Sequence, residues 1–200
     1  MMRMADRLDL RRRLQDVAFS QAGYFTAAQA KDVGYSYQAQ KYHADRGNWV
    51  RIDRGLFRLP GWPSDADDLY TRWYVWSEGR AVISYGSAAA VHDLGDLDAG
   101  PVHLTLADSR RTAEGAVLHP DHLESKDAEQ RGPFRVTTVA RTVLDLATWD
   151  LSQEQLNSVV RDALASGRLG RTELRRRMDG FGPAAALRLE RALADDEEPR

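Results

Sequence analysis

The sequence predicts an α+β protein, with an N-terminal helical domain that carries a β-hairpin and a second domain with a small sheet and a helical C-terminal end. Three observations predict this fold class. Helix patterns with clear capping residues occupy the chain before residue 47. A basic two-stranded ribbon follows them. Beyond residue 81, short strand patterns alternate with helix patterns, and the last fifty residues contain helix patterns alone.

Three helices are expected in the first fifty residues. Their ranges are residues 6–22, 27–33 and 37–46. Apolar residues at three- and four-residue spacing predict the first helix. Thr26 and Ser36 are the expected N-caps of the other two, because their hydroxyl groups can accept hydrogen bonds from first-turn amides. Gly34 and Gly47 then end these two helices.

The ribbon after the third helix has a tight turn between two apolar segments. Val50 and Ile52 belong to its first strand, and Leu56 to its second. Asp53-Arg54-Gly55 supplies the turn. Helix, turn, helix and hairpin in this order describe a winged helix-turn-helix domain, a module that usually binds DNA. Because the segment Pro60–Pro63 breaks the pattern, we expect domains over residues 1–62 and 63–200.

The second domain is expected to mix short strands with helices. The expected strands are residues 81–84, 102–106, 116–119 and 134–137. The expected helices are residues 65–76, 87–94, 139–147, 153–166, 173–178 and 183–194. Ser152, Thr172 and Pro183 are start signals for the last three helices. Strands that share a chain with a helical end predict an α+β domain.

Charge is distributed unevenly along the chain. Residues 1–62 hold eleven Lys or Arg and six Asp, a balance of +5. The remaining residues have a balance of −7, because the total is −2. A basic first third is typical of a surface that binds phosphates.

The amino-acid composition limits the cellular compartment and the cofactors that we expect for this protein. The chain has no cysteine, which excludes disulfides and thiolate metal sites. Its apolar runs are too short for a membrane span, and its first residues lack the apolar core of a signal peptide. We therefore expect a cytoplasmic protein with no membrane partner and no cofactor.

The candidate DNA-binding residues lie on the third helix and on the ribbon. A recognition helix places polar side chains of its N-terminal end in the major groove, where Gln can pair with adenine and Lys with guanine. Arginines of a ribbon can contact phosphates or the minor groove. The expected contacts are Ser36, Tyr37, Gln38, Gln40, Lys41, Arg46, Arg51, Arg54 and Arg58.

Three alternatives stay open beside a DNA-binding regulator. Asp121, Glu124 and Lys126 superficially resemble the carboxylate–lysine set of a metal-dependent nuclease, although their close spacing in a loop does not suit shared coordination. A second alternative is a zinc site, but ordinary surface or packed histidines are the favoured interpretation. Its candidate ligands are His92, Asp93, His103, His119, Asp121 and His122. The third is a protein-interaction module whose ribbon never meets DNA.

Several segments resemble one known family, the AbiEi-type antitoxins of type IV toxin–antitoxin systems. The similarity begins at Gly23-Tyr24-Phe25-Thr26 and continues through Gly34-Tyr35-Ser36 to the hairpin Arg46-Gly47-Asn48-Trp49…Arg54-Gly55-Leu56-Phe57. The segments Ile83–Ala90 and Thr138–Ala147 are similar to the parts of the family that follow the first domain. The resemblance covers most of the chain to about Ala147.

The resemblance implies a non-enzymatic transcriptional repressor. Its winged helix would bind double-stranded DNA at an operator with inverted repeats, and its second domain would counter a nucleotidyltransferase-like toxin. Some related chains append a nuclease-like domain, so the resemblance also keeps a winged-helix nuclease as an alternative. A general regulator without a toxin partner is the other alternative.

Overall fold

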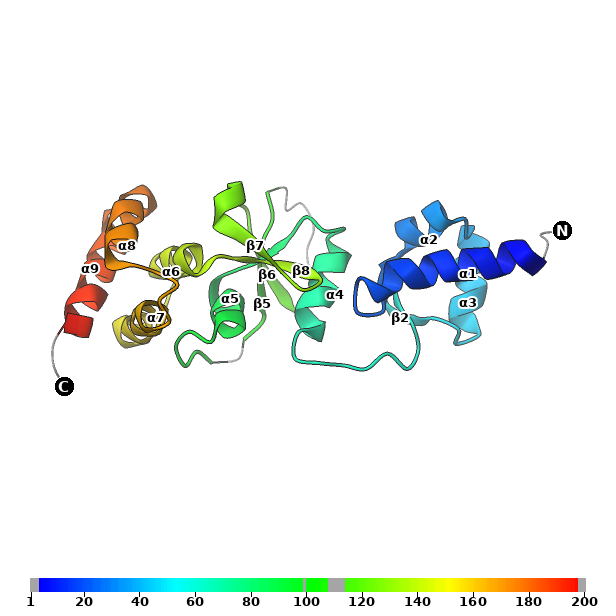
Figure 1. The fold of residues 1–200 in the computed structure, drawn as a ribbon, viewed down its shortest axis with the longest axis horizontal. Helices are drawn as coiled ribbons and strands as arrows, with labels where there is room; N and C mark the ends of the chain where they lie inside the picture. Colours follow the sequence, from blue (N-terminus) through cyan, green and yellow to red (C-terminus); the bar gives the residue numbers. More distant parts are fainter. Residues whose placement is uncertain (1–3, 99, 108–113, 198–200) are drawn as a thin grey trace. The chain divides into compact units, whose positions relative to one another are not determined.

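The computed structural model describes residues 4–98, 100–107 and 114–197 (Figure 1). The chain divides into two compact units. The first unit holds Met1–Arg80 and Gly132–Phe134, and the second holds Ala81–Arg131 and Arg135–Arg200. Helices and two β-sheets are both present, which confirms the predicted α+β class.

The first unit has the element order of a winged helix-turn-helix. Its helices are α1 (Met4–Phe19), α2 (Ala27–Val33), α3 (Tyr37–Asp45) and α4 (Asp68–Trp76). Its strands are β1 (Tyr24–Thr26), β2 (Val50–Asp53) and β3 (Leu56–Arg58). They form an antiparallel sheet in the order β1-β3-β2. The sheet therefore closes the hairpin against a short strand that lies between the first two helices in sequence.

The two caps predicted for the first unit are present in the structure, whereas the helix expected to start at Thr172 begins at Arg171, with Gly170 as its N-cap. The Thr26 hydroxyl accepts a hydrogen bond from the Gln29 amide, and the Gln29 side chain accepts one from the Thr26 amide, which completes a capping box. The Ser36 hydroxyl accepts a bond from the Ala39 amide at 3.2 Å. These caps fix where α2 and α3 begin, and so fix the turn between them.

The first helix is shorter than expected. It ends at Phe19, and a turn over residues 20–23 leads into β1. Gly23 has φ 83°, and a Cβ atom there would lie 2.6 Å from the Trp62 side chain. A glycine is therefore required at this turn, because both its backbone conformation and the close approach of Trp62 exclude a side chain.

An aromatic core joins the helices of the first unit to its sheet. The Phe25 and Trp49 rings meet edge to face at 5.0 Å, and Trp49 makes a similar contact with Tyr35 at 5.1 Å. Phe57 of β3 stacks on Phe25 at 5.8 Å. Leu14 and Ala18 of α1 complete this buried cluster. Residues of α1, β1 and β3, with one aromatic residue from the loop on each side of α3, thus fill the same small core.

The second unit is built on a five-stranded sheet in the order β6-β5-β4-β8-β7. Its strands are β4 (Val82–Ile83), β5 (Val102–Thr105), β6 (Ala116–His119), β7 (Ala128–Arg131) and β8 (Phe134–Thr137). The β4–β8 and β5–β6 pairs are parallel, whereas β4 and β5 are antiparallel. Strand β7 was not expected from the sequence, and a 3₁₀ turn over Ser125–Asp127 precedes it.

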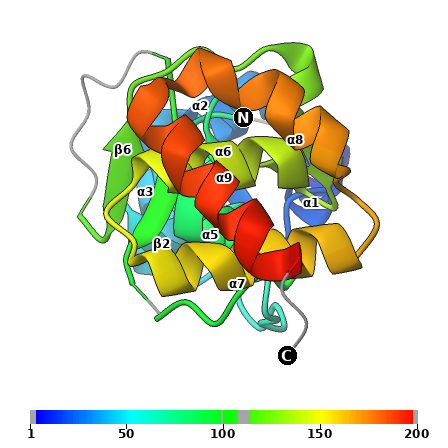
Figure 2. The ribbon, with the colours of Figure 1, turned by 90° about the vertical axis from the view of Figure 1, so that its left-hand side faces the viewer.

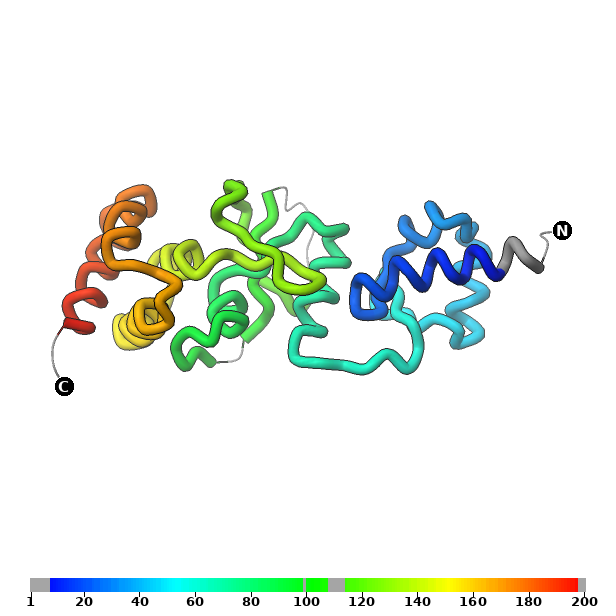
Figure 3. The backbone as a smooth tube through the Cα atoms, in the orientation of Figure 1, coloured from blue at the N-terminus to red at the C-terminus, as the bar shows by residue number. Residues whose placement is uncertain are grey.

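Helices form the rest of the second unit. They are α5 (Tyr85–His92), α6 (Val139–Thr148), α7 (Gln153–Ala165), α8 (Arg171–Met178) and α9 (Pro183–Glu197), with a 3₁₀ turn over Asp179–Phe181. The tube in Figure 3 follows the chain from β8 directly into α6. The last four helices lie against one another (Figure 2). Fully buried leucines such as Leu144, Leu156 and Leu189 fill the core that these helices share. Among the described residues, no helix has the length and apolar character needed to cross a membrane.

Helix α4 is tied to the winged helix through Asp68. The Arg58 guanidinium donates to Asp68 Oδ1 at 2.5 Å and to the Pro63 carbonyl at 3.1 Å. The Tyr24 hydroxyl donates to the other Asp68 oxygen at 3.1 Å. Burial and the Asp68 charge both raise the pKa of Tyr24. The first unit thus extends past the expected boundary at Trp62, and independent folding of residues 1–62 stays a prediction.

The Asp68→Asn variant should destabilise the first unit by about 1–3 kcal/mol, because it weakens the charged hydrogen bonds from Arg58 and Tyr24. Urea unfolding followed by tryptophan fluorescence measures this loss. Asp16→Asn, on the exposed side of α1, is the matched control and should leave the midpoint nearly unchanged. Equal midpoints for both variants would show that the Asp68 contacts contribute nothing.

Candidate nucleic-acid interface

Helix α3 has one face in solvent and one against the core. Its exposed residues are Tyr37, Gln38, Lys41, Tyr42 and Asp45. The two tyrosines are 64% and 56% exposed, which is high for large aromatic side chains. On the opposite face, the His43 ring stacks on Trp49 with 4.9 Å between centroids. Burial of that ring lowers the pKa of His43.

Gln40 lies on the buried face, contrary to its expected role. Its side chain is 3% exposed, and its amide nitrogen donates to the carbonyl oxygens of Ala27 and Tyr35 at 3.0 and 3.1 Å. These bonds hold α3 against the start of α2 and the turn before α3. Gln40 therefore positions the helix and cannot reach a base edge, whereas Gln38 stands in solvent.

The cations near α3 are partly engaged with neighbouring side chains. The Lys41 ammonium forms an ion pair with Asp45 at 2.5 Å. Arg46, the C-cap residue of α3, has its guanidinium over the Tyr42 ring at 5.5 Å. Lys31 of α2 has its ammonium over the Tyr37 ring at the same distance. All of these cations stay exposed, so each can exchange its present contact for a phosphate.

Two arginines of the hairpin are exposed, whereas a third is engaged in an ion pair within the first unit. Arg54 stands in the turn, where its backbone amide donates to Asp53 Oδ1 at 2.6 Å. Arg51 is exposed on β2, with its guanidinium 5.6 Å from the Phe57 ring centroid. Arg58 differs, because it is committed to Asp68 and its guanidinium lies over the Tyr24 ring at 4.6 Å. The expectation that Arg58 contacts DNA does not fit this position.

The nuclease-like residues of the second unit do not converge on a shared site. Asp121 is ion-paired with Arg141, and Glu124 with Lys126 at 2.8 Å. The buried Arg141 guanidinium also binds Asp145 at 2.6 Å and Asp127 at 3.4 Å. Burial raises the pKa of Asp145 to about 6, against the opposing effect of Arg141. The carboxylates here surround an arginine, where a nuclease would surround a metal ion.

Three histidines of the second unit serve packing, whereas the fourth, His122, is exposed. His103 and His119 lie side by side, with 3.0 Å between His103 Nδ1 and His119 Nε2. The Tyr85 ring stacks on the His119 ring, with 3.7 Å between the ring centroids. Burial lowers the pKa of both histidines, and that of His119 falls to about 4 with the added effect of His103. His92 is buried, with Nε2 2.7 Å from the Thr137 carbonyl oxygen. Among the described residues, no cluster of His, Asp or Glu is placed to hold a metal ion.

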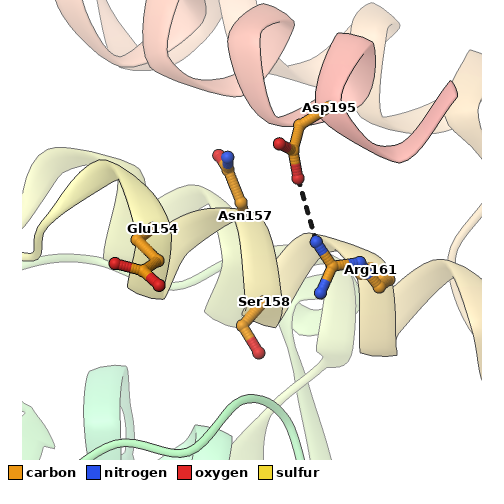
Figure 4. A pocket seen from close by; sticks show the side chains of 5 residues that line it. All are labelled: Glu154, Asn157, Ser158, Arg161 and Asp195. Atoms are coloured by element: carbon orange, nitrogen blue, oxygen red, sulfur yellow. Dashed lines mark hydrogen bonds and ion pairs between the residues drawn. The ribbon is translucent and has the colours of Figure 1, made fainter. Parts of the chain in front are cut away.

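The structure also shows a polar pocket between α7 and α9 that the sequence analysis did not single out (Figure 4). Its lining residues are Glu154, Asn157, Ser158, Arg161 and Asp195. The spacing of the first four places them on one face of a helix, which is a signal that could have grouped them. Arg161 already donates to Asp195 at 2.9 Å, so the cation of this pocket is neutralised within it.

Part of the first unit is similar to a known protein family. Residues 12–60 match the family model described as "Transcriptional regulator, AbiEi antitoxin". This confirms the predicted resemblance over those residues. The fold is similar to the crystal structure of the RV2827C protein from Mycobacterium tuberculosis, with a TM-score of 0.63 and 16% identity over 95% of this chain and 78% of that one. No curated protein matches the chain.

The Gln40→Ala variant should lower the free energy of unfolding by about 1–3 kcal/mol, because it leaves two buried carbonyl oxygens without their donor. The Gln38→Ala variant on the exposed face should change it by less than about 0.5 kcal/mol. Chemical denaturation of the two variants under the same conditions measures the difference. Similar losses for both would contradict the assignment of Gln40 to the core.

Acid should destabilise the second unit partly through His119. Its pKa is lower in the folded state, about 4 against the ordinary 6.5, so the unfolded state binds more protons between these values and stability falls as the pH falls. Asp145, with its raised pKa of about 6, has the opposite effect between its ordinary 3.8 and 6. His119→Phe keeps a ring on Tyr85 and should reduce the slope of stability against pH by at most about 1.4 kcal/mol per pH unit.

Unfolding free energies of the wild type and His119→Phe between pH 4 and 6.5 provide the measurement. Because Asp145 is present in both proteins, the difference between the two slopes isolates the histidine. Identical slopes would contradict the lowered pKa of His119.

Proposed function

We propose that this protein is a sequence-specific DNA-binding transcriptional repressor of the AbiEi antitoxin type. The observation that carries the proposal is the exposed polar face of α3, together with the exposed arginines Arg46 at its end and Arg51 and Arg54 on the hairpin. The proposal is supported by the match of residues 12–60 to a family of transcriptional regulators. The charge balance of +5 in residues 1–62 supports it as well.

In this proposal α3 lies in the major groove of the DNA, and the hairpin lies along the DNA sugar–phosphate backbone. Ser36 caps the helix and Tyr37 begins it, and Gln38 presents an exposed side-chain amide that can form two hydrogen bonds with adenine, at N6 and N7. Arg51 and Arg54 neutralise phosphates or enter the minor groove. Gln40 and Arg58 act behind this surface by holding α3 and the hairpin in place.

The repressor is proposed to act without catalysis. Asp121, which the nuclease alternative requires, is engaged by Arg141, and Glu124 is engaged by Lys126. Incubation of the purified protein with plasmid DNA and magnesium or manganese tests this point. Metal-dependent cleavage that is lost in Asp121→Ala would restore the nuclease alternative.

The wider role is proposed from the family. An operator with inverted repeats would hold two copies of the chain, one on each half-site. The second unit would counter a nucleotidyltransferase-like toxin in the cytoplasm, where both the operon and the toxin act. Coexpression with the product of a neighbouring gene tests this role, because a toxin that arrests growth alone should become harmless beside its antitoxin.

The binding proposal is tested by the salt dependence of affinity for a random duplex. Replacement of Arg54 by alanine should remove about one phosphate contact and reduce the slope of log K against log salt by about 0.9. Fluorescence anisotropy titrations at salt concentrations from about 50 to 200 mM measure this slope. Arg12→Ala, which removes an exposed arginine of α1, should leave the slope unchanged. A slope unaffected by Arg54→Ala would remove the hairpin from the interface.

A further inference from the structure

An acidic residue stands on the face of α3 that the proposed function turns toward DNA. Asp45 is exposed in the last turn of the helix, and its carboxylate contacts the Lys41 ammonium at 2.5 Å. Both side chains are largely in solvent, one turn apart on the same face as Gln38. The pair therefore occupies the middle and the end of the proposed reading surface.

The stability of α3 does not account for an aspartate at this position. A negative charge near a helix C-terminus opposes the helix dipole. An exposed pair with the lysine before the acid is the weaker of the two orientations, and such a pair contributes little to the stability of a helix. Asp45 also neutralises Lys41, which reduces the attraction of this face for phosphates. The residue thus costs local stability and non-specific affinity together.

We propose that Asp45 is a specificity-determining residue that reads a G·C base pair together with Lys41. This inference rests on the proposed function, in which α3 lies in the major groove. The Lys41 ammonium donates to O6 and N7 of guanine, and the Asp45 carboxylate accepts from the N4 amino group of cytosine. Side chains four residues apart are separated by about 6 Å along the helix, within reach of one base pair or two adjacent ones.

An A·T pair fits the two side chains less well than a G·C pair. A G·C pair places two adjacent acceptors, N7 and O6 of guanine, beside the cytosine N4 amino group, whereas an A·T pair places the adenine N6 amino group between two separated acceptors, adenine N7 and thymine O4. Where the ammonium and the carboxylate cannot both be matched, the carboxylate is repelled by the nearby phosphates without full compensation. Asp45 therefore penalises non-cognate DNA more than cognate DNA, and Lys41 is released from Asp45 where both find partners on the bases.

Selection from a pool of random duplexes tests this assignment, with the full chain as bait. The wild type should enrich a motif that contains a G·C pair in each half-site. Asp45→Asn and Lys41→Ala should lose the preference at that same base pair and keep the others. Asp45→Asn should also bind the unselected pool about three- to tenfold more tightly at low salt, because one repulsive charge is removed. Asp16→Asn on α1 makes the same charge change away from α3 and should behave as the wild type.

The outcomes separate this inference from the proposed function. If the wild type binds no duplex in the pool, both are overturned. If the wild type enriches a motif and Asp45→Asn enriches the same motif at every position, the specificity role of Asp45 is wrong and DNA binding stands. Loss of preference at different positions in Asp45→Asn and Lys41→Ala would equally overturn the shared reading of one base pair.

Discussion

The stacking of His43 on Trp49 is the contact on which the proposed interface depends. It fixes the inner face of α3 against a ring that also meets Phe25 and Tyr35. With that face committed to the core, the residues one-half turn away must stand in solvent. Gln40 reinforces the same orientation through its bonds to two carbonyl oxygens. The surface offered by α3 is thus a consequence of the packing behind it.

Arginines fill two different roles in this protein. Arg51 and Arg54 are exposed, whereas Arg58 and Arg141 are held by carboxylates in partly or fully buried positions. An arginine enclosed in this way is costly to replace, since its partners would keep uncompensated charges. Exposed arginines on a hairpin carry no such constraint, which leaves them available for contact with a polyanion.

Local sequence signals predicted the helix starts of the winged helix correctly, since Thr26 and Ser36 cap helices through bonds to amides only three residues away. They missed β1, because its three residues are a strand through their pairing with β3, which is distant in sequence. The same limit explains Gln40 and Arg58. Their partners are Tyr35, Ala27 and Asp68, and only the tertiary fold brings these groups together. The exposure of Gln38 and Arg54 was easier to predict, because a helix start and a hairpin turn are local features.

The most direct test of the proposed interface is to titrate the full chain with a random DNA duplex and to map the changes in its backbone amide NMR chemical shifts. We expect the largest changes on residues 36–46 and on the hairpin around Arg54. Residues packed behind them, such as Gln40, should change through their amides while their side-chain bonds persist. Changes confined to the second unit, with α3 and the hairpin unaffected, would contradict the assignment of the interface.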